Sequence, residues 1–344
     1  MTSKRRIVMN LRERRPLWDA PPWALDEIRA ALPEEWECLS LSFAADGTGD
    51  GGGVSAEVLD AARGAEVYLG YGVPRELFRA ARDTLRWAHS AAAGVGGSLY
   101  PEMVASDVIL TNSAGVHAEP IADTVLAMML HFARGLDWAV RAQAERRWGK
   151  EPFEAADAPV RELSEGTVGL LGLGGIGEAV ARRAVALGMR VAAMRRSSAD
   201  APEGVEVLAG DGALDRVLSI SDYLVVTVPR TAETEGMVGA RELARLPRGA
   251  VLVNVSRGGI VDEAALADAL RSGALRGAAL DVFSTEPLPA SSPLWGLPNA
   301  LLLPHVSGSS HRFWRRETDL IVANLRRYLA GERLLNTVDK HAGY

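Results

Sequence analysis

The chain of 344 residues contains 48% apolar and 24% charged residues and carries a formal net charge of −6, which is typical of a globular protein with about two domains. The acidic balance argues against a nucleic-acid or anionic-membrane partner. A single cysteine, Cys38, excludes an internal disulfide, and no His/Cys cluster predicts a metal site. Because the chain has no apolar run of ~18 residues and no signal-peptide core, we expect a cytoplasmic protein.

The first 110 residues alternate between short apolar runs and helical patterns. Such alternation predicts a parallel sheet with helices packed on it. The predicted strands are RIVMNL (6–11), AEVYLGYG (65–72), LRWAHSAAAG (85–94) and DVILTN (107–112), and the predicted helices are WALDEIRAAL (23–32) and PRELFRAAR (74–82).

A second α/β half is predicted beyond this region. It begins with one long helix over residues 119–148, followed by a polar connection over residues 151–165. An amphipathic helix and a tail, starting at residue 313, end the chain. The strands predicted between them are TVGLL (167–171), RVAAM (190–194), DYLVVTVP (222–229), AVLVNVSRGG (250–259), GAALDVF (277–283) and ALLLPHV (300–306).

A glycine-rich turn, GLGGIG, joins the first strand of this half to a helix. Gly172, Gly174 and Gly177 have the G-x-G-x-x-G spacing, in which the first glycine allows a tight turn. The second lets the backbone approach a pyrophosphate, and the third allows close packing of helix on strand. Phosphates would meet the free N–H groups of Gly175 and Ile176 at the start of the helix. The turn therefore predicts a dinucleotide site.

The following strand ends at Arg195, where an NAD-binding chain carries an acidic residue for the ribose 2′-hydroxyl. A carboxylate would repel a 2′-phosphate, whereas a guanidinium pairs with one. Arg196 adds a second guanidinium, and Ser197 and Ser198 add hydroxyl donors. The alternative is that both arginines are solvated charges in an exposed turn. We predict that NADP(H) is preferred and that NAD(H) is possible.

Arg257, Glu286 and His305 each follow a predicted strand of this half or lie at its end. Ligands of open α/β sheets bind at the carboxyl ends of the strands, so we expect the three side chains in one crevice. An arginine can bind a carboxylate and polarise a carbonyl. A histidine can carry a proton near neutral pH, and a neighbouring glutamate favours its charged form. Each residue alone has an ordinary structural alternative, but together they suit the reduction of a 2-oxo acid.

Together GLGGIG, SRGGIVDEAAL, LDVFSTEPLP and PHVSGSS resemble the D-isomer-specific 2-hydroxyacid dehydrogenases, in the glyoxylate/hydroxypyruvate reductase-like branch. The resemblance runs from about residue 60 to the end of the chain. It implies that Arg257 binds the substrate and that His305 is the acid/base, with Glu286 as its carboxylate partner. It also implies NADPH-dependent reduction of a 2-oxo acid to a D-2-hydroxy acid.

The resemblance implies two Rossmann-like or flavodoxin-like α/β domains with parallel sheets. The coenzyme domain (115–305) would be inserted into the substrate domain (1–114 with 306–344), and the protein would be a homodimer. Further coenzyme contacts are expected at Val228, Pro229, Val255, Ser256, Asp281 and Gly308, with Asp281 and the backbone of Val255 and Ser256 at the nicotinamide carboxamide. Substrate contacts are expected at Gly94 and Val95, whose amides would bind the carboxylate, at Tyr71, and at Trp148, which could reach the partner's active site or simply pack in the interface.

The sequence departs from the family pattern in the carboxylate loop, where Gly96 and Gly97 replace an acidic or amide residue, and at Arg230, which we expect to be an exposed charge. Two other functions stay open. One is a nucleotide-sensing binding protein like the C-terminal-binding corepressors, although the chain shows no extended tail or interaction motif. The other is a dehydrogenase for another hydride donor, such as formate or phosphite.

Overall fold

The structure is a computed structural model that describes residues 5–42, 44–45, 54–196 and 202–343. The chain divides into two compact units, Met1–His117 with Ser309–Tyr344 and, between these segments, Ala118–Gly308. We call them unit 1 and unit 2. The predicted boundaries at 114/115 and 305/306 differ from these by three residues each. No helix in the described part of the chain is both long and apolar enough to cross a membrane.

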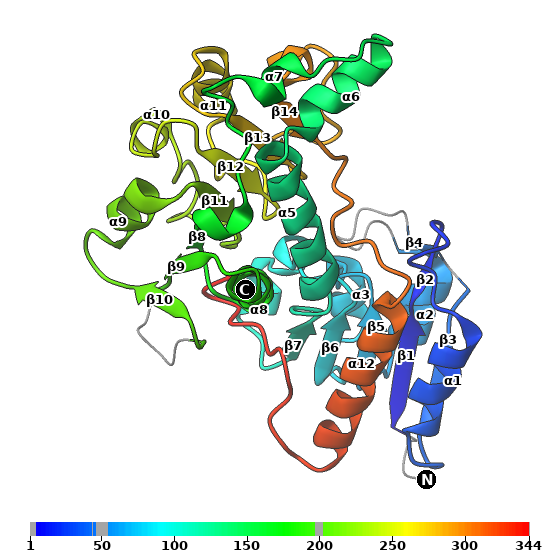
Figure 1. Ribbon diagram of the computed structural model, residues 1–344. Coiled ribbons are helices and arrows are strands. Elements are labelled where there is room, and N and C mark those ends of the chain that lie inside the picture. The colour runs from blue at the N-terminus through cyan, green and yellow to red at the C-terminus, as the bar shows by residue number, and fades with distance from the viewer. Residues whose placement is uncertain (1–4, 43, 46–53, 197–201, 344) are drawn as a thin grey trace. The chain divides into compact units, whose positions relative to one another are not determined.

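Unit 1 contains a five-stranded parallel sheet (Figure 1). Its strand order, β3-β1-β5-β6-β7, becomes 2-1-3-4-5 when only these strands are counted, which is the flavodoxin-like order. A short pair, β2 (Arg12–Glu13) and β4 (Ala44–Ala45), lies outside the sheet. The sheet strands are β1 (Arg6–Asn10), β3 (Glu37–Ser40), β5 (Val67–Gly70), β6 (Trp87–Ser90) and β7 (Ile109–Asn112).

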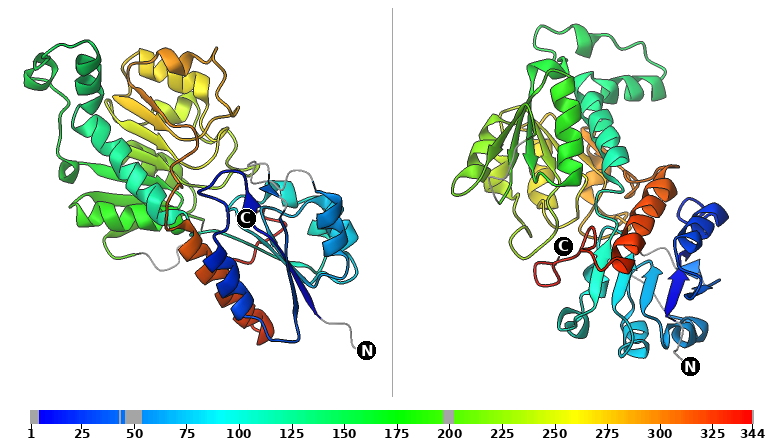
Figure 2. Two further views of the ribbon diagram at one scale, coloured as in Figure 1. Left: turned by 90° about the vertical axis from the view of Figure 1, so that its right-hand side faces the viewer. Right: turned by 90° about the horizontal axis from the view of Figure 1, so that it is seen from below.

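Helices cover both faces of this sheet. One face packs against α1 (Pro22–Ala30) and α12 (Phe313–Leu329), which run side by side in Figure 2 as blue and orange-red helices. The other face packs against α2 (Ala56–Ala62), α3 (Arg75–Ala80) and α4 (Pro101–Val104). The last helix of the chain therefore completes the core that the first residues begin.

Unit 2 contains a seven-stranded parallel sheet in the order β10-β9-β8-β11-β12-β13-β14. Counted along the chain this is 3-2-1-4-5-6-7, which extends the order of the doubly wound dinucleotide-binding fold by one strand. The predicted fold class is confirmed. The strands are β8 (Thr167–Leu171), β9 (Arg190–Met194), β10 (Val205–Leu208), β11 (Tyr223–Val226), β12 (Val251–Asn254), β13 (Gly277–Leu280) and β14 (Ala300–Leu302).

Successive strand residues in unit 2 face opposite cores, so the central strands are apolar on both sides. Leu170 belongs to the core under α5 (Ala118–Ala133) and α8 (Gly175–Ala186). Leu171 belongs to the core on the other face. The helices of that second face are α9 (Ala213–Ile220), α10 (Ala240–Leu243) and α11 (Glu263–Arg271). Unit 2 also contains three short helical segments, α7 (Glu151–Glu154), η2 (Leu163–Glu165) and η3 (Pro293–Gly296).

The single helix predicted over residues 119–148 is wrong, because the structure has two helices there. After α5, Gly135 adopts a left-handed conformation (φ 65°) and α6 (Leu136–Ala144) begins. A Cβ on Gly135 would lie 2.8 Å from Cε1 of Phe153 and 3.0 Å from Cε3 of Trp138. Glycine is therefore required both by the backbone and by the neighbouring rings.

Candidate active site

The strand order of unit 2 reverses beside β8, which has β9 on one side and β11 on the other. Ligands of doubly wound sheets bind outside the carboxyl ends of the strands at such a reversal. The ends of β8, β9 and β11 carry the glycine turn, Arg195 and Val228, respectively. The topology thus gathers predicted coenzyme residues from three strands at one edge of the sheet.

The three motif glycines differ in what the fold requires of them. Gly172 has a φ of 103°, and a Cβ there would lie 3.0 Å from the Val228 nitrogen. A Cβ on Gly177 would lie 2.3 Å from the Gly172 carbonyl oxygen, so helix and turn pack at backbone contact. A Cβ on Gly174 would meet nothing within 4 Å. The fold alone explains the first and third glycines, whereas the second leaves open space that suits a pyrophosphate.

The helix after the turn offers an anion site. Gly174 caps α8 without any side-chain hydrogen bond, so the first N–H groups of the helix, at Gly175 and Ile176, have no capping acceptor. Gly174 and Gly175 are exposed and Ile176 is half-buried. Free N–H groups at a helix N-terminus bind phosphate groups, and the helix dipole adds to the attraction.

Arg195 is half-buried, and its backbone N–H donates to the Leu208 carbonyl at 3.1 Å. Its guanidinium makes no hydrogen bond or ion pair with the residues that the structure describes. The cation is thus held beside the dinucleotide turn while its donors stay available. The predicted contacts of Ser197 and Ser198 lie outside the described residues.

Arg196 is exposed and its charge acts on the loop that follows β11. A hydrogen bond from Thr231 above all, and more weakly the charge of Arg196, hold the pKa of the Glu233 carboxyl below its usual range. The Thr231 hydroxyl donates to Glu233 Oε2 at 2.6 Å. The carboxyl ends of β9 and β11 therefore carry groups of opposite charge on the two sides of the glycine turn.

His305 and Glu286 form a hydrogen-bonded pair. The imidazole Nδ1 lies 2.7 Å from Glu286 Oε2, and the other oxygen, Oε1, accepts the Phe283 N–H at 2.9 Å. A carboxylate at Nδ1 keeps the proton on that nitrogen and leaves Nε2 for chemistry. The His305 side chain is 49% exposed, so this nitrogen is within reach of a ligand.

The backbone of the His305 turn is held by Asp281. His305 has a φ of 54°, a left-handed conformation that is rare for a residue with a side chain. The Asp281 carboxylate is buried and accepts the N–H groups of Val306 at 2.7 Å and Ser307 at 3.0 Å, as well as the Ser307 hydroxyl. Strained backbone persists only where its surroundings over-determine it. Asp281 is part of that support.

Arg257 follows β12 and is exposed. Its Nη1 donates to the Ser256 carbonyl at 2.7 Å. The next residue, Gly258, packs so tightly that a Cβ there would lie 1.9 Å from the Phe283 carbonyl oxygen. The turn that carries Arg257 therefore touches the loop that carries Glu286.

Comparisons with known proteins identify the family of this chain. A family model described as D-isomer specific 2-hydroxyacid dehydrogenase, NAD binding domain, matches residues 126–307. A glyoxylate reductase from Korarchaeum cryptofilum is 36% identical over 271 residues, which cover 78% of this chain and 80% of that protein. A glyoxylate/hydroxypyruvate reductase B from Pectobacterium atrosepticum is 39% identical over 235 residues, or 67% and 72% of the two chains.

Solved structures match nearly the whole chain. One of them is a D-isomer specific 2-hydroxyacid dehydrogenase from Xanthobacter autotrophicus Py2 in complex with NADPH and MES, 34% identical, with a TM-score of 0.80. The match covers 99% of this chain and 100% of that one. This chain belongs to the D-isomer-specific 2-hydroxyacid dehydrogenase family. The family resemblance inferred from the sequence motifs is confirmed, and the protein is an NAD(P)-dependent dehydrogenase.

Three of the substrate residues expected in this dehydrogenase lie in unit 1. Val95 is buried and Gly94 half-buried, in the loop between β6 and the short helix η1 (Gly96–Ser98). Neither of their N–H groups donates a hydrogen bond to another described residue, so both could serve a carboxylate. The phenol of Tyr71 is buried and donates to the Trp18 carbonyl, and burial, reinforced by nearby acidic residues, raises its pKa well above the usual range.

The remaining predicted coenzyme residues differ in exposure. Val228, Val255 and Ser256 are buried, Gly308 is half-buried, and Pro229 is exposed. The Ser256 hydroxyl donates to the Val228 carbonyl and so joins the loops after β12 and β11. These contacts fix the loops, while their predicted roles toward the coenzyme stay predictions.

Arg230 was predicted to be an exposed charge. It is exposed, and it is paired with Glu235 at 2.6 Å.

Three residues that support the site were not predicted for that role. The N–H of Ser307 donates to Asp281 and the N–H of Phe283 donates to Glu286, and Asn254 bonds to both sides of the Arg257 turn. Every residue except proline has a backbone N–H, so the sequence does not indicate which of these groups will support a site. Asn254 was detectable as a buried amide directly after an apolar strand.

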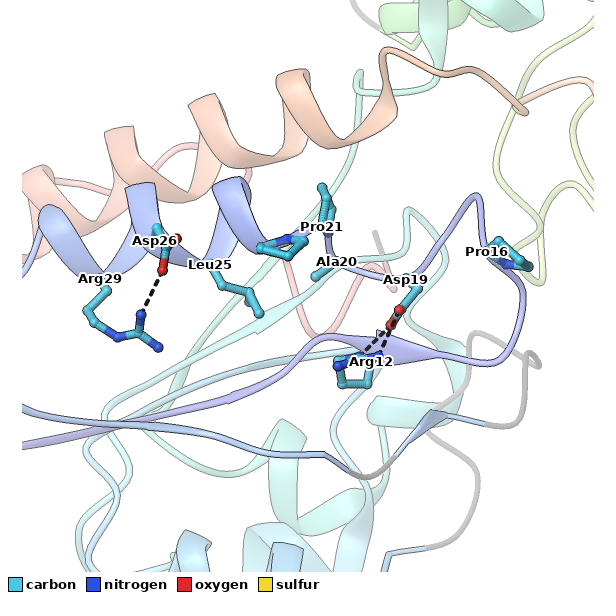
Figure 3. A pocket seen from close by; sticks show the side chains of 9 residues that line it. Arg12, Pro16, Asp19, Ala20, Pro21, Leu25, Asp26 and Arg29 are labelled. Atoms are coloured by element: carbon cyan, nitrogen blue, oxygen red, sulfur yellow. Dashed lines mark hydrogen bonds and ion pairs between the residues drawn. The ribbon is translucent and has the colours of Figure 1, made fainter.

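Two further observations concern other binding chemistry. A pocket of about 400 Å³ in unit 1 is shown in Figure 3. Its two arginines, Arg12 and Arg29, are paired with Asp19 and Asp26, and it holds no predicted site residue. Within the described ranges, no three His, Cys, Asp or Glu side chains cluster in a way that could hold a metal ion.

Proposed function

We propose that this dehydrogenase reduces a small 2-oxo acid to the D-2-hydroxy acid with NADPH, with glyoxylate and hydroxypyruvate as the best substrates. The observation that carries the proposal is the His305–Glu286 pair, at 2.7 Å, since the loop of Glu286 is in contact with the Arg257 turn. The two curated relatives described above are a glyoxylate reductase and a glyoxylate/hydroxypyruvate reductase. Membership of the family supports NAD(P)H-dependent reduction of 2-oxo acids.

His305 would donate the proton in this reduction. Glu286 holds Nδ1, so Nε2 can carry a proton and donate it to the carbonyl oxygen of the substrate. When bound, the reduced nicotinamide supplies the hydrogen and the two electrons that reach the carbonyl carbon.

Arg257 and the backbone amides of the loop that follows β6 would bind a carboxylate group of the substrate. The guanidinium has five N–H donors, of which one is used by the Ser256 carbonyl. The others suit a bidentate contact with a carboxylate. The N–H groups of Gly94 and Val95, which donate to no other described residue, would bind a substrate carboxylate in unit 1. We propose that unit 1 is the substrate domain.

The coenzyme would be held by unit 2. The open space at Gly174 and the uncapped start of α8 fit a pyrophosphate. The guanidinium of Arg195, which pairs with none of the described residues, fits a 2′-phosphate better than a 2′-hydroxyl. The solved relative from Xanthobacter autotrophicus Py2 is a complex with NADPH, which supports the same preference, with NADH as a weaker alternative.

We further propose a cytoplasmic homodimer. Closed two-fold dimers are the most frequent assembly of soluble chains. Trp148, 86% exposed, and two apolar side chains of α6, Leu136 at 46% and Val140 at 59%, lie open on unit 2. A second copy of the chain would cover them.

The test is a panel of 2-oxo acids, from glyoxylate and hydroxypyruvate to branched and aromatic acids, each assayed with NADPH and with NADH. We expect the highest kcat/KM for the two small acids with NADPH. Absence of turnover on every acid would contradict the proposal and favour a nucleotide-sensing role. Size-exclusion chromatography with light scattering tests the dimer.

A further inference from the structure

Asn254 is an amide at the end of an apolar strand. It is the last residue of β12, after Val251, Leu252 and Val253, and its side chain is buried. Because β12 lies between β11 and β13, it is a central strand with both faces covered. A polar side chain in such surroundings costs free energy unless both ends of it are hydrogen-bonded.

Both ends of this amide bond to the turn that carries Arg257. The Oδ1 atom accepts the Ser256 N–H at 3.1 Å, and Nδ2 donates to the Arg257 carbonyl at 3.2 Å. One side chain therefore holds the backbone before and after the Ser256–Arg257 peptide bond.

The orientation of that peptide bond controls the guanidinium. Arg257 is exposed, and among the described residues its guanidinium is anchored by the Ser256 carbonyl, which accepts Nη1 at 2.7 Å. This carbonyl belongs to the peptide group that Asn254 brackets. Rotation of the peptide would move the carbonyl and with it the guanidinium.

Asparagine is suited to this task by its chemistry. An amide carries an acceptor and a donor on one planar group, whereas an aspartate carries two acceptors and a leucine neither. Aspartate would keep the Ser256 bond but bring a carboxylate oxygen against the Arg257 carbonyl. Shape alone is therefore insufficient, and the donor is required.

We propose that Asn254 is a positioning residue that holds the Arg257 guanidinium in the orientation that binds the substrate carboxylate. The inference rests on the proposed substrate-binding role of Arg257. It predicts that loss of the amide impairs substrate binding more than coenzyme binding, because the groups proposed to hold the coenzyme phosphates, the glycine turn and Arg195, are on other strands, and only the expected nicotinamide contact of Val255 and Ser256 adjoins Asn254.

The experiment compares Asn254→Ala and Asn254→Asp with wild type and with Asn299→Ala. Asn299 is a matched control, since its half-buried amide donates to the Leu270 carbonyl at 3.1 Å and makes no hydrogen bond to the described residues of the Arg257 turn. We expect KM for glyoxylate to rise about tenfold or more in both Asn254 variants, the effect of misaligning one hydrogen bond to a charged group. The Kd of NADPH should stay within about twofold, and Asn299→Ala should match wild type.

A merely structural role would lower the folded fraction and hence kcat, but leave KM unchanged. Wild-type KM in Asn254→Asp would overturn the proposal, because it would show that the donor is not needed. Hydrogen exchange of the peptide that contains Ser256 and Arg257 gives a readout independent of turnover. We expect faster exchange in Asn254→Ala than in Asn299→Ala, and equal rates would also overturn the proposal. If wild type reduced no 2-oxo acid, the proposed function would fail while the exchange data still tested the turn.

Discussion

His305 combines an exposed imidazole with a carboxylate that fixes one of its nitrogens. We expect His305→Ala to lower kcat by about 10² to 10⁴, the usual contribution of a positioned acid. The Kd of NADPH should be unchanged, because the glycine turn does not depend on this side chain. Steady-state kinetics and fluorescence titration of NADPH check both statements. His341→Ala, in an exposed histidine of unit 1, is the control, and near wild-type turnover of His305→Ala would refute the assignment.

Arg195 carries the prediction of coenzyme preference. We expect Arg195→Asp to lower the ratio of kcat/KM with NADPH to kcat/KM with NADH by about tenfold or more, since a charge-assisted bond is replaced by repulsion. Arg190→Asp, at the exposed start of the same strand β9, should leave the ratio unchanged. An unchanged ratio in Arg195→Asp would mean that this arginine is a solvated surface charge.

At the scale of elements, different glycines of the β8–α8 turn serve folding and coenzyme binding. Gly177→Ala places a Cβ 2.3 Å from the Gly172 carbonyl oxygen, so we expect the free energy of unfolding to fall by about 1–3 kcal/mol, the cost of overpacking. Gly174→Ala meets no atom within 4 Å and should change stability by less. It should nevertheless weaken NADPH binding. Urea unfolding and NADPH titration of both variants test the contrast, and equal loss of stability would contradict it.

Several elements of the fold follow from the sequence pattern, and the exceptions have two causes. The buried strands β1, β5, β8 and β12 are apolar on both faces and were predicted. The strands β3 and β10 were missed, and both are edge strands. The residues of β3 are half-buried or exposed, so their sequence, ECLS, carries no apolar run. The break at Gly135 was missed because the flanking residues continue a helical pattern and the rings that require glycine come from Trp138 and Phe153.

At the scale of the whole molecule, a buried pair joins distant parts of unit 1. His89 of β6 and Glu317 of α12 are fully buried, and Nε2 lies 2.8 Å from Oε1. The other nitrogen, Nδ1, lies 2.8 Å from the Thr111 hydroxyl. Because these bonds link the end of the chain to the central sheet, they help to hold the returning helix in the unit that the first residues form.

We expect His89→Ala to lower the free energy of unfolding by about 3–5 kcal/mol, because it leaves a buried carboxylate without its partner. Asp319→Ala is the control on the same helix, since Asp319 pairs with Arg315 at the surface and should cost less than about 1 kcal/mol. Urea unfolding followed by tryptophan fluorescence measures both changes. Similar losses for the two variants would show that burial of the His89 pair does not set its strength.

The sequence by itself determined the family, the α/β class, the coenzyme turn and the residue types of the proposed chemistry. Short stretches of sequence are enough to indicate these features. The glycines have a fixed spacing, and Arg257, Glu286 and His305 each come after an apolar strand. Tertiary structure alone decided which groups hold those residues in place. Asn254 bonds the Arg257 turn, Asp281 accepts backbone N–H groups of the His305 loop, and His89 meets a glutamate 228 positions away. The hydrogen-bond partners are backbone atoms or side chains far away in the sequence, and the pattern of residue types along the chain predicts neither.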